Sequence, residues 1–407
     1  MRLPTLHIAL HGKPIAKLIQ LQGDRNLFVF EQSYLDDRER ATLSLSFHTK
    51  TGEVLNQFKP MQTRLMPFLS NLLPEGAMRH YLAQQAGIKP EREFYLLAAL
   101  GQDLAGAITV SAEQELAWQG QAKEIQLVEP EQANLSMMRF SLAGIQIKFS
   151  ALPNLQSSLT VPTKGVGGSW IVKLPDTRFS GVPENEYAFM RLAARLGITV
   201  PDIQLLPLEQ IQGLPTALQD QGKLAFVIRR FDRDAQGKAI HIEDFAQIFA
   251  VYPERKYEAA NYRSLARLIW DVVGEKGLVE FIHRLTFNLL IGNGDMHLKN
   301  WSLIYPDERT AQLAPAYDFL STVPYLKNDT LALKFVDSKA FQIVSRAEFQ
   351  RFAQKAKLPE RLILDAVDEL LAAFVWQWRD KEQWGLAPNV ATALEQHLQQ
   401  LPLWAER

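Results

Sequence analysis

Apolar and polar residues alternate along four short segments near the beginning of the chain, at residues 6–10, 16–21, 27–32 and 41–47. Turn-forming glycines follow three of these segments, at Gly12, Gly23 and Gly52. Alternation with a period of two is typical of strands that bury one face of a sheet. The pattern therefore predicts an antiparallel sheet in the first 55 residues.

Helical spacing of apolar residues follows the predicted sheet, at residues 68–73, 75–86 and 91–100. Sheet and helices together predict a small α+β module that ends near Val110. Further strands are predicted at residues 140–142, 147–151, 170–174 and 225–228. A helix at residues 183–196 interrupts this second strand-rich region, because Pro183 suits a first helical turn and Gly197 suits a helix end.

The chain becomes mainly helical after residue 242. Apolar residues recur with a 3.6-residue period in five segments, at residues 265–273, 278–290, 346–355, 359–377 and 390–401. A length of 407 residues is long for one hydrophobic core and suggests two or three domains. Strands followed by a block of helices predict an α+β protein with two lobes, an arrangement that often places a ligand cleft between the lobes.

Composition narrows the classes of function. The net charge of −1 gives no electrostatic reason to expect that this chain alone binds nucleic acid tightly, since phosphate contacts need clustered Lys and Arg. The chain has no cysteine, which excludes disulfides, zinc–thiolate sites and cysteine nucleophiles. It has neither a signal-peptide pattern nor a long apolar run, so the expected location is the cytoplasm, without a membrane span.

The segment that carries most chemical information follows the apolar stretch at residues 281–291. A Gly-Asn-Gly turn there precedes four polar residues, Asp295, His297, Lys299 and Asn300. In phosphoryl transfer, an Asp that orients and deprotonates the attacking hydroxyl is followed five residues later by an Asn that binds a metal ion. Asp318, expected on the next strand, is placed to hold the metal that bridges the phosphates. A polar loop that only caps two elements is the alternative interpretation.

A kinase also needs a lysine on a strand, paired with an acidic residue from a helix. Lys173 is the single charge in the apolar segment 170–174 and is well placed to point into a cleft. A position at an exposed edge, with its stem buried, is the alternative. The helix that follows offers Glu184 and Glu186. Glu186 shares a face with apolar residues of that helix and is the preferred partner of Lys173.

Two segments are candidates for the loop that covers the phosphates, residues 140–148 and the more glycine-rich residues 165–169. Glycine content alone favours the second, although it also suits a plain hairpin turn. Neither is a Walker A loop, which disfavours P-loop enzymes. The backbone from Arg229 to Phe231 could meet an adenine ring, or could simply end a strand with a surface salt bridge.

Taken in order, these segments make the chain resemble HipA-type toxin Ser/Thr protein kinases over nearly its whole length. The resemblance is carried by the segments 68–76, 96–107, 141–148, 171–175, 184–186, 230–233, 293–300 and 317–321. It implies an α+β, two-lobed protein-kinase-like fold, with ATP and Mg²⁺ as cofactors. The implied domains are an N-terminal α+β module at residues 1–110, a strand-rich N-lobe at 111–235 and a helical C-lobe at 236–407.

The resemblance also implies site residues. Asp295 and Lys299 are implied to be catalytic, and Asn300 and Asp318 to bind metal. The nucleotide-binding residues that it implies are Lys173, Glu186, Ser141, Ala143, Gly144, Gln146, Arg229, Phe231 and His297. It places the phosphate-covering loop at residues 141–146, against the glycine content. Ser141 resembles the family's autophosphorylated serine, where added negative charge would repel the nucleotide and inactivate the enzyme.

Partners are implied in the same way. HipA-like chains are neutralised by a HipB-like helix-turn-helix antitoxin, and the pair represses its operator DNA. Family substrates include an aminoacyl-tRNA synthetase, and nothing in this sequence identifies the target protein. The chain departs from the family pattern at Ile147, where an acidic residue is usual, and at Arg229 before Arg-Phe-Asp-Arg. A nucleotide-binding pseudokinase scaffold and a small-molecule kinase are the alternative functions.

Overall fold

The structure is a computed structural model, and it describes residues 3–49, 51–113, 148–153, 159–160, 168–176, 178–214 and 222–407. The chain divides into two compact units. Unit 1 comprises Met1–Ser169, Phe231–Arg255 and Leu303–Thr310. Unit 2 comprises Trp170–Arg230, Lys256–Ser302 and Ala311–Arg407. Each unit therefore collects stretches that are distant in sequence.

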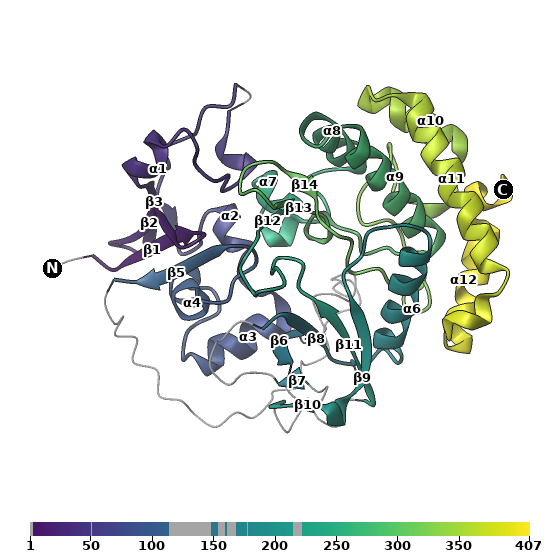
Figure 1. Cartoon of the computed structure of the whole chain (residues 1–407), viewed down its shortest axis with the longest axis horizontal. Coiled ribbons are helices and arrows are strands. Elements are labelled where there is room, and N and C mark those ends of the chain that lie inside the picture. Colours follow the sequence, from purple (N-terminus) through teal and green to yellow (C-terminus); the bar gives the residue numbers. More distant parts are fainter. Residues whose placement is uncertain are drawn as a thin grey trace. The chain divides into compact units, whose positions relative to one another are not determined.

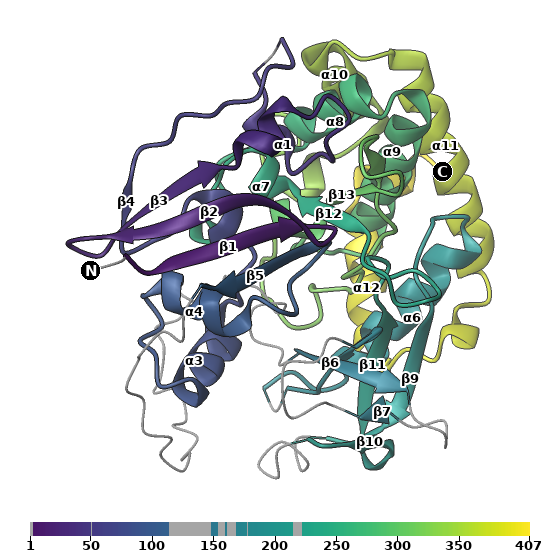
Figure 2. The same ribbon diagram turned by 60° about the vertical axis from the view of Figure 1, so that its left-hand side comes forward.

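Unit 1 contains an antiparallel sheet with the strand order β4-β3-β2-β1-β5 (Figures 1 and 2). Its strands are β1 (Thr5–Leu10), β2 (Lys13–Leu21), β3 (Arg25–Phe30), β4 (Met61–Gln62) and β5 (Ile108–Ala112). In the register of this sheet, Ile8 of β1 pairs with Ala16 of β2 on one side and with Val110 of β5 on the other. The first three strands confirm the alternating pattern, because alternate residues along each are buried.

The fourth predicted strand, at residues 41–47, is wrong. This segment has no strand, and it ends in a 3₁₀ turn at Leu45–Phe47. The Ser44 hydroxyl accepts a hydrogen bond from the Ser46 backbone amide at 3.1 Å and thereby begins the turn. Serine side chains often offer the backbone such an alternative to sheet pairing.

Short helices complete unit 1: α1 (Gln32–Asp36), α2 (Pro67–Ser70), α3 (Gly76–Gln85), α4 (Glu93–Leu100) and α7 (Phe245–Ile248). Its remaining strands are β6 (Lys148–Pro153), β7 (Leu159–Thr160), β12 (His241–Asp244) and most of β13 (Ser302–Tyr305). The buried face of the sheet forms the core, in which Phe28 stacks on Phe47 with ring centroids 5.6 Å apart. Burying one such ring contributes about 1.5–3 kcal/mol.

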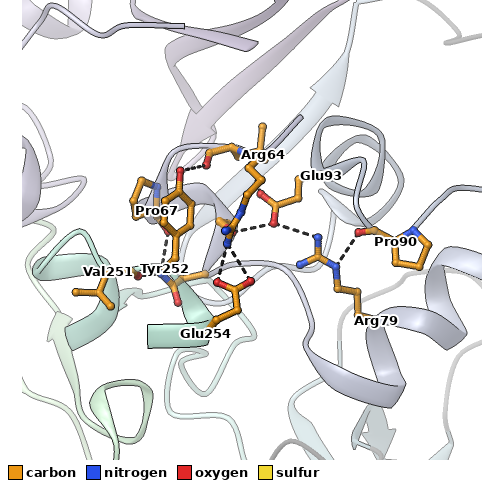
Figure 3. Close-up of polar contacts among 11 residues, drawn as sticks. Arg64, Pro67, Arg79, Pro90, Glu93, Val251, Tyr252 and Glu254 are labelled. Atoms are coloured by element: carbon orange, nitrogen blue, oxygen red, sulfur yellow. Dashed lines mark hydrogen bonds and ion pairs between the residues drawn. The ribbon is translucent and has the colours of Figure 1, made fainter. Parts of the chain in front are cut away.

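A buried carboxylate joins three parts of unit 1 (Figure 3). Glu93 is 1% exposed, and its Oε2 accepts a hydrogen bond from the Leu65 amide at 2.8 Å. Its Oε1 accepts from the Ser70 hydroxyl at 2.9 Å and from the Arg79 guanidinium at 3.0 Å. Both carboxylate oxygens thus have donors, as a buried charge requires.

Unit 2 contains three antiparallel neighbours, β8 (Trp170–Lys173), β11 (Leu224–Arg229) and β9 (Ile203–Pro207), with β11 in the middle. Helix α6 (Val182–Arg195) packs against β11 and β9. Lys173 pairs in register with Phe226, so the last residue of β8 lies beside a buried aromatic position. Two short strands, β10 (Ile211–Gln212) and β14 (Gln312–Leu313), also belong to this unit.

The helices predicted after residue 242 are confirmed: α8 (Tyr262–Val272), α9 (Glu275–Leu290), α10 (Arg346–Ala356), α11 (Glu360–Trp378) and α12 (Pro388–Gln400), with α13 (Pro402–Ala405) in addition. Helix α9 packs against α8 and α11, and most of its last two turns are buried. The side chains of Asn261 and Ser345 cap α8 and α10 by accepting from backbone amides. Among the described residues, no helix is long and apolar enough to cross a membrane.

Candidate active site

Lys173, at the end of β8, is the centre of a buried charge cluster in unit 2. The side chain of Lys173 is 4% exposed, and its Nζ donates a hydrogen bond to Glu186 Oε1 at 2.5 Å. The same ammonium donates to Asp318 Oδ1. Glu186 lies on the buried face of α6, whereas Glu184 is partly exposed. The structure thus brings Lys173 to Glu186 rather than to Glu184; the role of this pair stays a prediction.

In the contacts of the described residues, one ammonium faces two carboxylates. Burial alone lowers the pKa of Lys173, but the carboxylates of Asp318 and Glu186 outweigh it and raise this pKa above its ordinary value. The lysine therefore stays protonated. Buried carboxylates that lie around one ammonium are also the kind of group that a bound cation stabilises.

Asp318 does not lie on a strand, contrary to the prediction. Its φ of 58° lies in the left-handed region, which a strand excludes. Such a conformation costs about 1–3 kcal/mol in a residue other than glycine, and it persists where the surroundings hold it. Asn185, which precedes Glu186 on α6, exchanges two hydrogen bonds of 2.9 Å with the backbone of Ser321. The helix that delivers Glu186 also fixes the segment that follows Asp318.

The loop that follows α9 is held by a second set of polar contacts. The Asn293 side chain donates to Asn288 Oδ1 at 2.8 Å and to the Asp318 carbonyl at 3.1 Å, and it accepts from the Asp295 amide at 3.0 Å. One amide side chain thus connects the backbones at both acidic residues. A Cβ on Gly294 would lie 2.4 Å from the Asp329 carboxylate, so no larger residue fits there.

Asp295 and Asn300 lie at the two ends of this loop and are both buried. The Asn300 amide nitrogen donates to the Asp295 carbonyl at 2.9 Å, which closes the loop between these two residues. Because that nitrogen is bound to the backbone, the amide oxygen of Asn300 is the group suited to a metal ion. His297 is buried in the same loop, and Lys299 is partly buried in the 3₁₀ turn Leu298–Asn300.

The sequence analysis missed Tyr257. Its hydroxyl donates a hydrogen bond of 2.5 Å to Asp295 Oδ1 from 38 positions earlier in the chain. Its ring meets the His297 ring edge-on, with centroids 4.9 Å apart. No pattern in the sequence connects residues so far apart, and only the packing of unit 2 reveals the contact.

Other predicted residues belong to other segments of the chain or lie outside the described residues. Ser141, Ala143, Gly144 and Gln146 are outside the described residues, and so are residues 165–167 of the alternative loop. Arg229 ends β11 in unit 2 and forms a partly exposed ion pair with Asp202, at 3.1 Å. Phe231 is the first residue of a unit 1 segment. The adenine contact therefore stays a prediction.

A hollow of about 390 Å³ lies in unit 1 and contains none of the predicted site residues. Three arginines line it, but one of them, Arg309, pairs with Glu39, and the lining carboxylate of Asp307 accepts backbone hydrogen bonds from Arg309 and Thr310. The lining thus keeps a net positive charge, because Arg38 and Arg40 face only the one carboxylate of Asp307 among its described residues. Among the described residues, no group of three His, Asp or Glu side chains could hold a metal by itself.

Comparison with family models covers most of the chain. Residues 6–111 match the HipA N-terminal domain, and residues 140–378 match the HipA-like C-terminal domain. Y4dM of Sinorhizobium fredii, a protein provisionally named as a kinase, is 45% identical over 100% of this chain and 99% of its own. The serine/threonine-protein kinase toxin HipA of Shewanella oneidensis is 25% identical over 73% of this chain and 72% of its own.

A solved structure matches the whole fold. It is HipA of Shewanella oneidensis in a complex with HipB and operator DNA, with a TM-score of 0.76. The match covers 99% of this chain and 97% of that one, at 21% identity. The predicted α+β, two-lobed kinase-like fold is therefore confirmed.

Proposed function

Because this chain belongs to the HipA-like kinase family, containing both of the family's domains in order, we propose that it is a protein Ser/Thr kinase. It transfers the γ-phosphate of ATP to a serine or threonine hydroxyl. In this reaction a bond forms between the hydroxyl oxygen and the γ-phosphorus, the bond between that phosphorus and the β,γ-bridging oxygen breaks, and ADP leaves. The hydroxyl proton passes to a carboxylate.

The observation that carries the proposal is the buried cluster of Lys173, Glu186 and Asp318, joined through Asn293 to the loop of Asp295. A strand lysine paired with a helix glutamate, a metal-binding Asp, a base and an Asn five residues after the base form the working set of a protein kinase. A scaffold without activity would not need to retain all of them. The complete set favours catalysis over the pseudokinase alternative.

The donor set fits ATP with Mg²⁺. The Asp318 carboxylate and the Asn300 amide oxygen are hard oxygen ligands of the kind that Mg²⁺ prefers, together with phosphate oxygens. Two carboxylates beside one ammonium are also compatible with a cation there. When bound, Mg²⁺ would neutralise the negative charge that develops on the phosphates. Lys173, held by Glu186, would then contact phosphate oxygens in place of Asp318.

Asp295 takes the role of general base in this proposal. Its carboxylate orients the acceptor hydroxyl and accepts its proton as the phosphorus bond forms. Lys299, in the same loop, adds positive charge near the transferred group, and His297 contributes to the nucleotide site. Ser141 is the proposed acceptor in cis, and its phosphate would repel ATP and silence the enzyme.

Partners and location belong to the same proposal. The matching solved complex holds HipA with HipB and operator DNA. We infer that this chain is likewise the toxin of a cytoplasmic pair, with a helix-turn-helix antitoxin that supplies most of the DNA affinity. The net charge of −1 is consistent with that division. The target is a protein hydroxyl, for which an aminoacyl-tRNA synthetase is the first candidate to test.

The test is transfer of labelled phosphate. With γ-labelled ATP and Mg²⁺, the wild-type chain should label Ser141, as located by mass spectrometry. Asp295→Asn should reduce transfer by about 10²–10⁴-fold, because the base is lost while the shape is kept. Asp271→Asn, which removes an exposed carboxylate paired with Arg267 in the same unit, should transfer phosphate at the wild-type rate. ATP binding without transfer to the chain or to a cell lysate would favour the scaffold instead.

A further inference from the structure

We propose that Tyr257 is a positioning residue for the candidate base, and that its phenol fixes the orientation in which the Asp295 carboxylate meets the acceptor hydroxyl. The inference rests on the proposed kinase function for its kinetic consequences. Its structural basis is the hydrogen bond of 2.5 Å from the Tyr257 hydroxyl to Asp295 Oδ1. This bond engages one of the two oxygens that a base uses to orient its substrate.

Tyr257 is itself held at two points, its ring and its backbone. Its ring lies edge-on against the buried His297 ring, with an interplanar angle of 82°. On the backbone side, Lys339 Nζ donates to the Tyr257 carbonyl at 2.9 Å. A donor held in this way loses little freedom when it binds the carboxylate, so the bond restrains the carboxylate rather than the reverse.

Residues near Tyr257 in the chain also form hydrogen bonds with the loop that contains Asp295. The Leu298 amide donates to the Lys256 carbonyl at 3.3 Å, and the Tyr262 hydroxyl donates to the Met296 carbonyl at 3.1 Å. These two contacts reach the backbone of the loop. The Tyr257 contact instead reaches the reacting group. The segment therefore positions the loop through its backbone and the base through one phenol.

Two consequences follow for catalysis. A hydroxyl that donates to a carboxylate stabilises the charged form, so loss of the phenol should move the protonation of the base to higher pH. Loss of the restraint should also lower the fraction of molecules in which the carboxylate is aligned with the acceptor. Nucleotide binding involves neither effect, so the KM for ATP should stay the same while kcat falls.

The experiment compares two identical substitutions in one segment. Tyr257→Phe removes the hydroxyl at the base, and Tyr262→Phe removes a hydroxyl whose described hydrogen bonds are to backbone groups, at Met296 and Leu333. In Tyr257→Phe we expect kcat to fall about tenfold and the acid limb of its pH profile to move to higher pH by about one unit. Tyr262→Phe should keep the wild-type pH profile, even if its rate falls. A wild-type profile and a kcat within twofold in Tyr257→Phe would overturn the inference.

A second readout does not depend on activity. In full-length protein with ¹³C-labelled aspartate carboxyls, the Asp295 signal is assigned by its loss in Asp295→Asn and is then titrated. Its midpoint should move to higher pH in Tyr257→Phe and not in Tyr262→Phe. If the midpoint moves but the wild-type chain transfers no phosphate, the positioning contact is upheld and the kinase proposal fails. If transfer occurs and neither midpoint nor kcat changes, the kinase proposal stands and the role of Tyr257 is wrong.

Discussion

Both units bury acidic side chains, but they balance the charge differently. In unit 1, Glu93 faces Arg79, Ser70 and the Leu65 amide, so one carboxylate has one cation and two neutral donors. In unit 2, two carboxylates, Glu186 and Asp318, share the ammonium of Lys173. In the described contacts, the first group sets one cation against one carboxylate, and the second sets one cation against two carboxylates.

This difference separates a structural role from a functional one. A neutral, fully bonded buried pair holds chain segments together, and breaking it leaves an uncompensated charge. A buried cluster with excess charge lowers stability until a ligand balances it, and such arrangements are typical of active sites. We therefore expect substitutions in the two groups to affect different quantities: turnover in unit 2 and the free energy of unfolding in unit 1.

The largest expected effect comes from Asp318→Asn. It should lower phosphate transfer about a thousandfold, equivalent to roughly 4 kcal/mol of transition-state stabilisation, because the proposed metal ligand is lost. The free energy of unfolding without ligand should stay within about 1 kcal/mol or rise, since Lys173 then forms a neutral buried pair with Glu186. Radiolabelled transfer and urea denaturation measure the two quantities. Wild-type turnover would remove Asp318 from the metal role, and a strongly lowered stability would show that its charge is structural.

The opposite result is expected for Glu93→Gln in unit 1. An amide cannot accept at both positions, so one donor among Leu65, Ser70 and Arg79 loses its acceptor, and the free energy of unfolding should fall by about 3 kcal/mol. Transfer by the folded fraction should change less than about threefold if the role is purely structural.

The neighbouring ion pair in Figure 3 provides the control. Glu254 binds Arg64 at 2.7 Å, but both side chains are substantially exposed. Glu254→Gln should therefore cost less than about 1 kcal/mol in urea denaturation. Equal losses from the two substitutions would mean that burial does not distinguish these pairs.

The sequence predicted those features whose signal lies within a short stretch of chain. Period-two alternation identified β1 to β3, and 3.6-residue periodicity identified α8 to α12, because one face of each element is buried. The spacing of Asp295 and Asn300 was visible because both residues lie within one short stretch of chain. The structure closes that loop by a hydrogen bond between residues five positions apart.

The sequence could not predict features that are decided by a side-chain hydrogen bond within a turn or by contacts between distant segments. Residues 41–47 alternate like a strand, yet Ser44 begins a turn there, and the left-handed backbone at Asp318 has no local signal. Tyr257 reaches Asp295 across 38 positions. The predicted domain boundaries at residues 110 and 235 stay predictions, since each compact unit is assembled from three separate stretches.

A second buried carboxylate in unit 1, Glu243 on β12, differs from Glu93 because it pairs with no cation among the described residues. Its Oε1 accepts hydrogen bonds from the Tyr305 hydroxyl and, at 3.1 Å, from the Leu45 amide. Its Oε2 has no hydrogen-bond partner among the described residues. Burial raises the pKa of Glu243 to about 7, although these hydrogen bonds oppose the shift. Burial lowers the pKa of His241, on the same strand, to about 4.

These two shifts give opposite dependences of stability on pH. Between about pH 4.5 and 7, folded Glu243 holds a proton that the unfolded chain has lost, so stability falls as pH rises. Between about pH 4 and 6.5, the unfolded chain protonates His241 while the folded chain does not, so stability rises with pH. The two contributions therefore largely cancel between about pH 4.5 and 6.5. Replacing one of the two side chains should therefore reveal the pH dependence of stability that the other contributes.

The smallest expected effect is accordingly the pH response of Glu243→Gln. Between pH 5 and pH 8, its free energy of unfolding should increase relative to the wild-type chain by about 2 kcal/mol, because the variant never buries a carboxylate. Glu53→Gln, at an exposed position of the same unit, should show no such change. Urea denaturation at pH 5, 6.5 and 8 measures the difference. A constant difference across that range would show that Glu243 is ionised at pH 5, and it would then resemble Glu93 as a fully balanced charge.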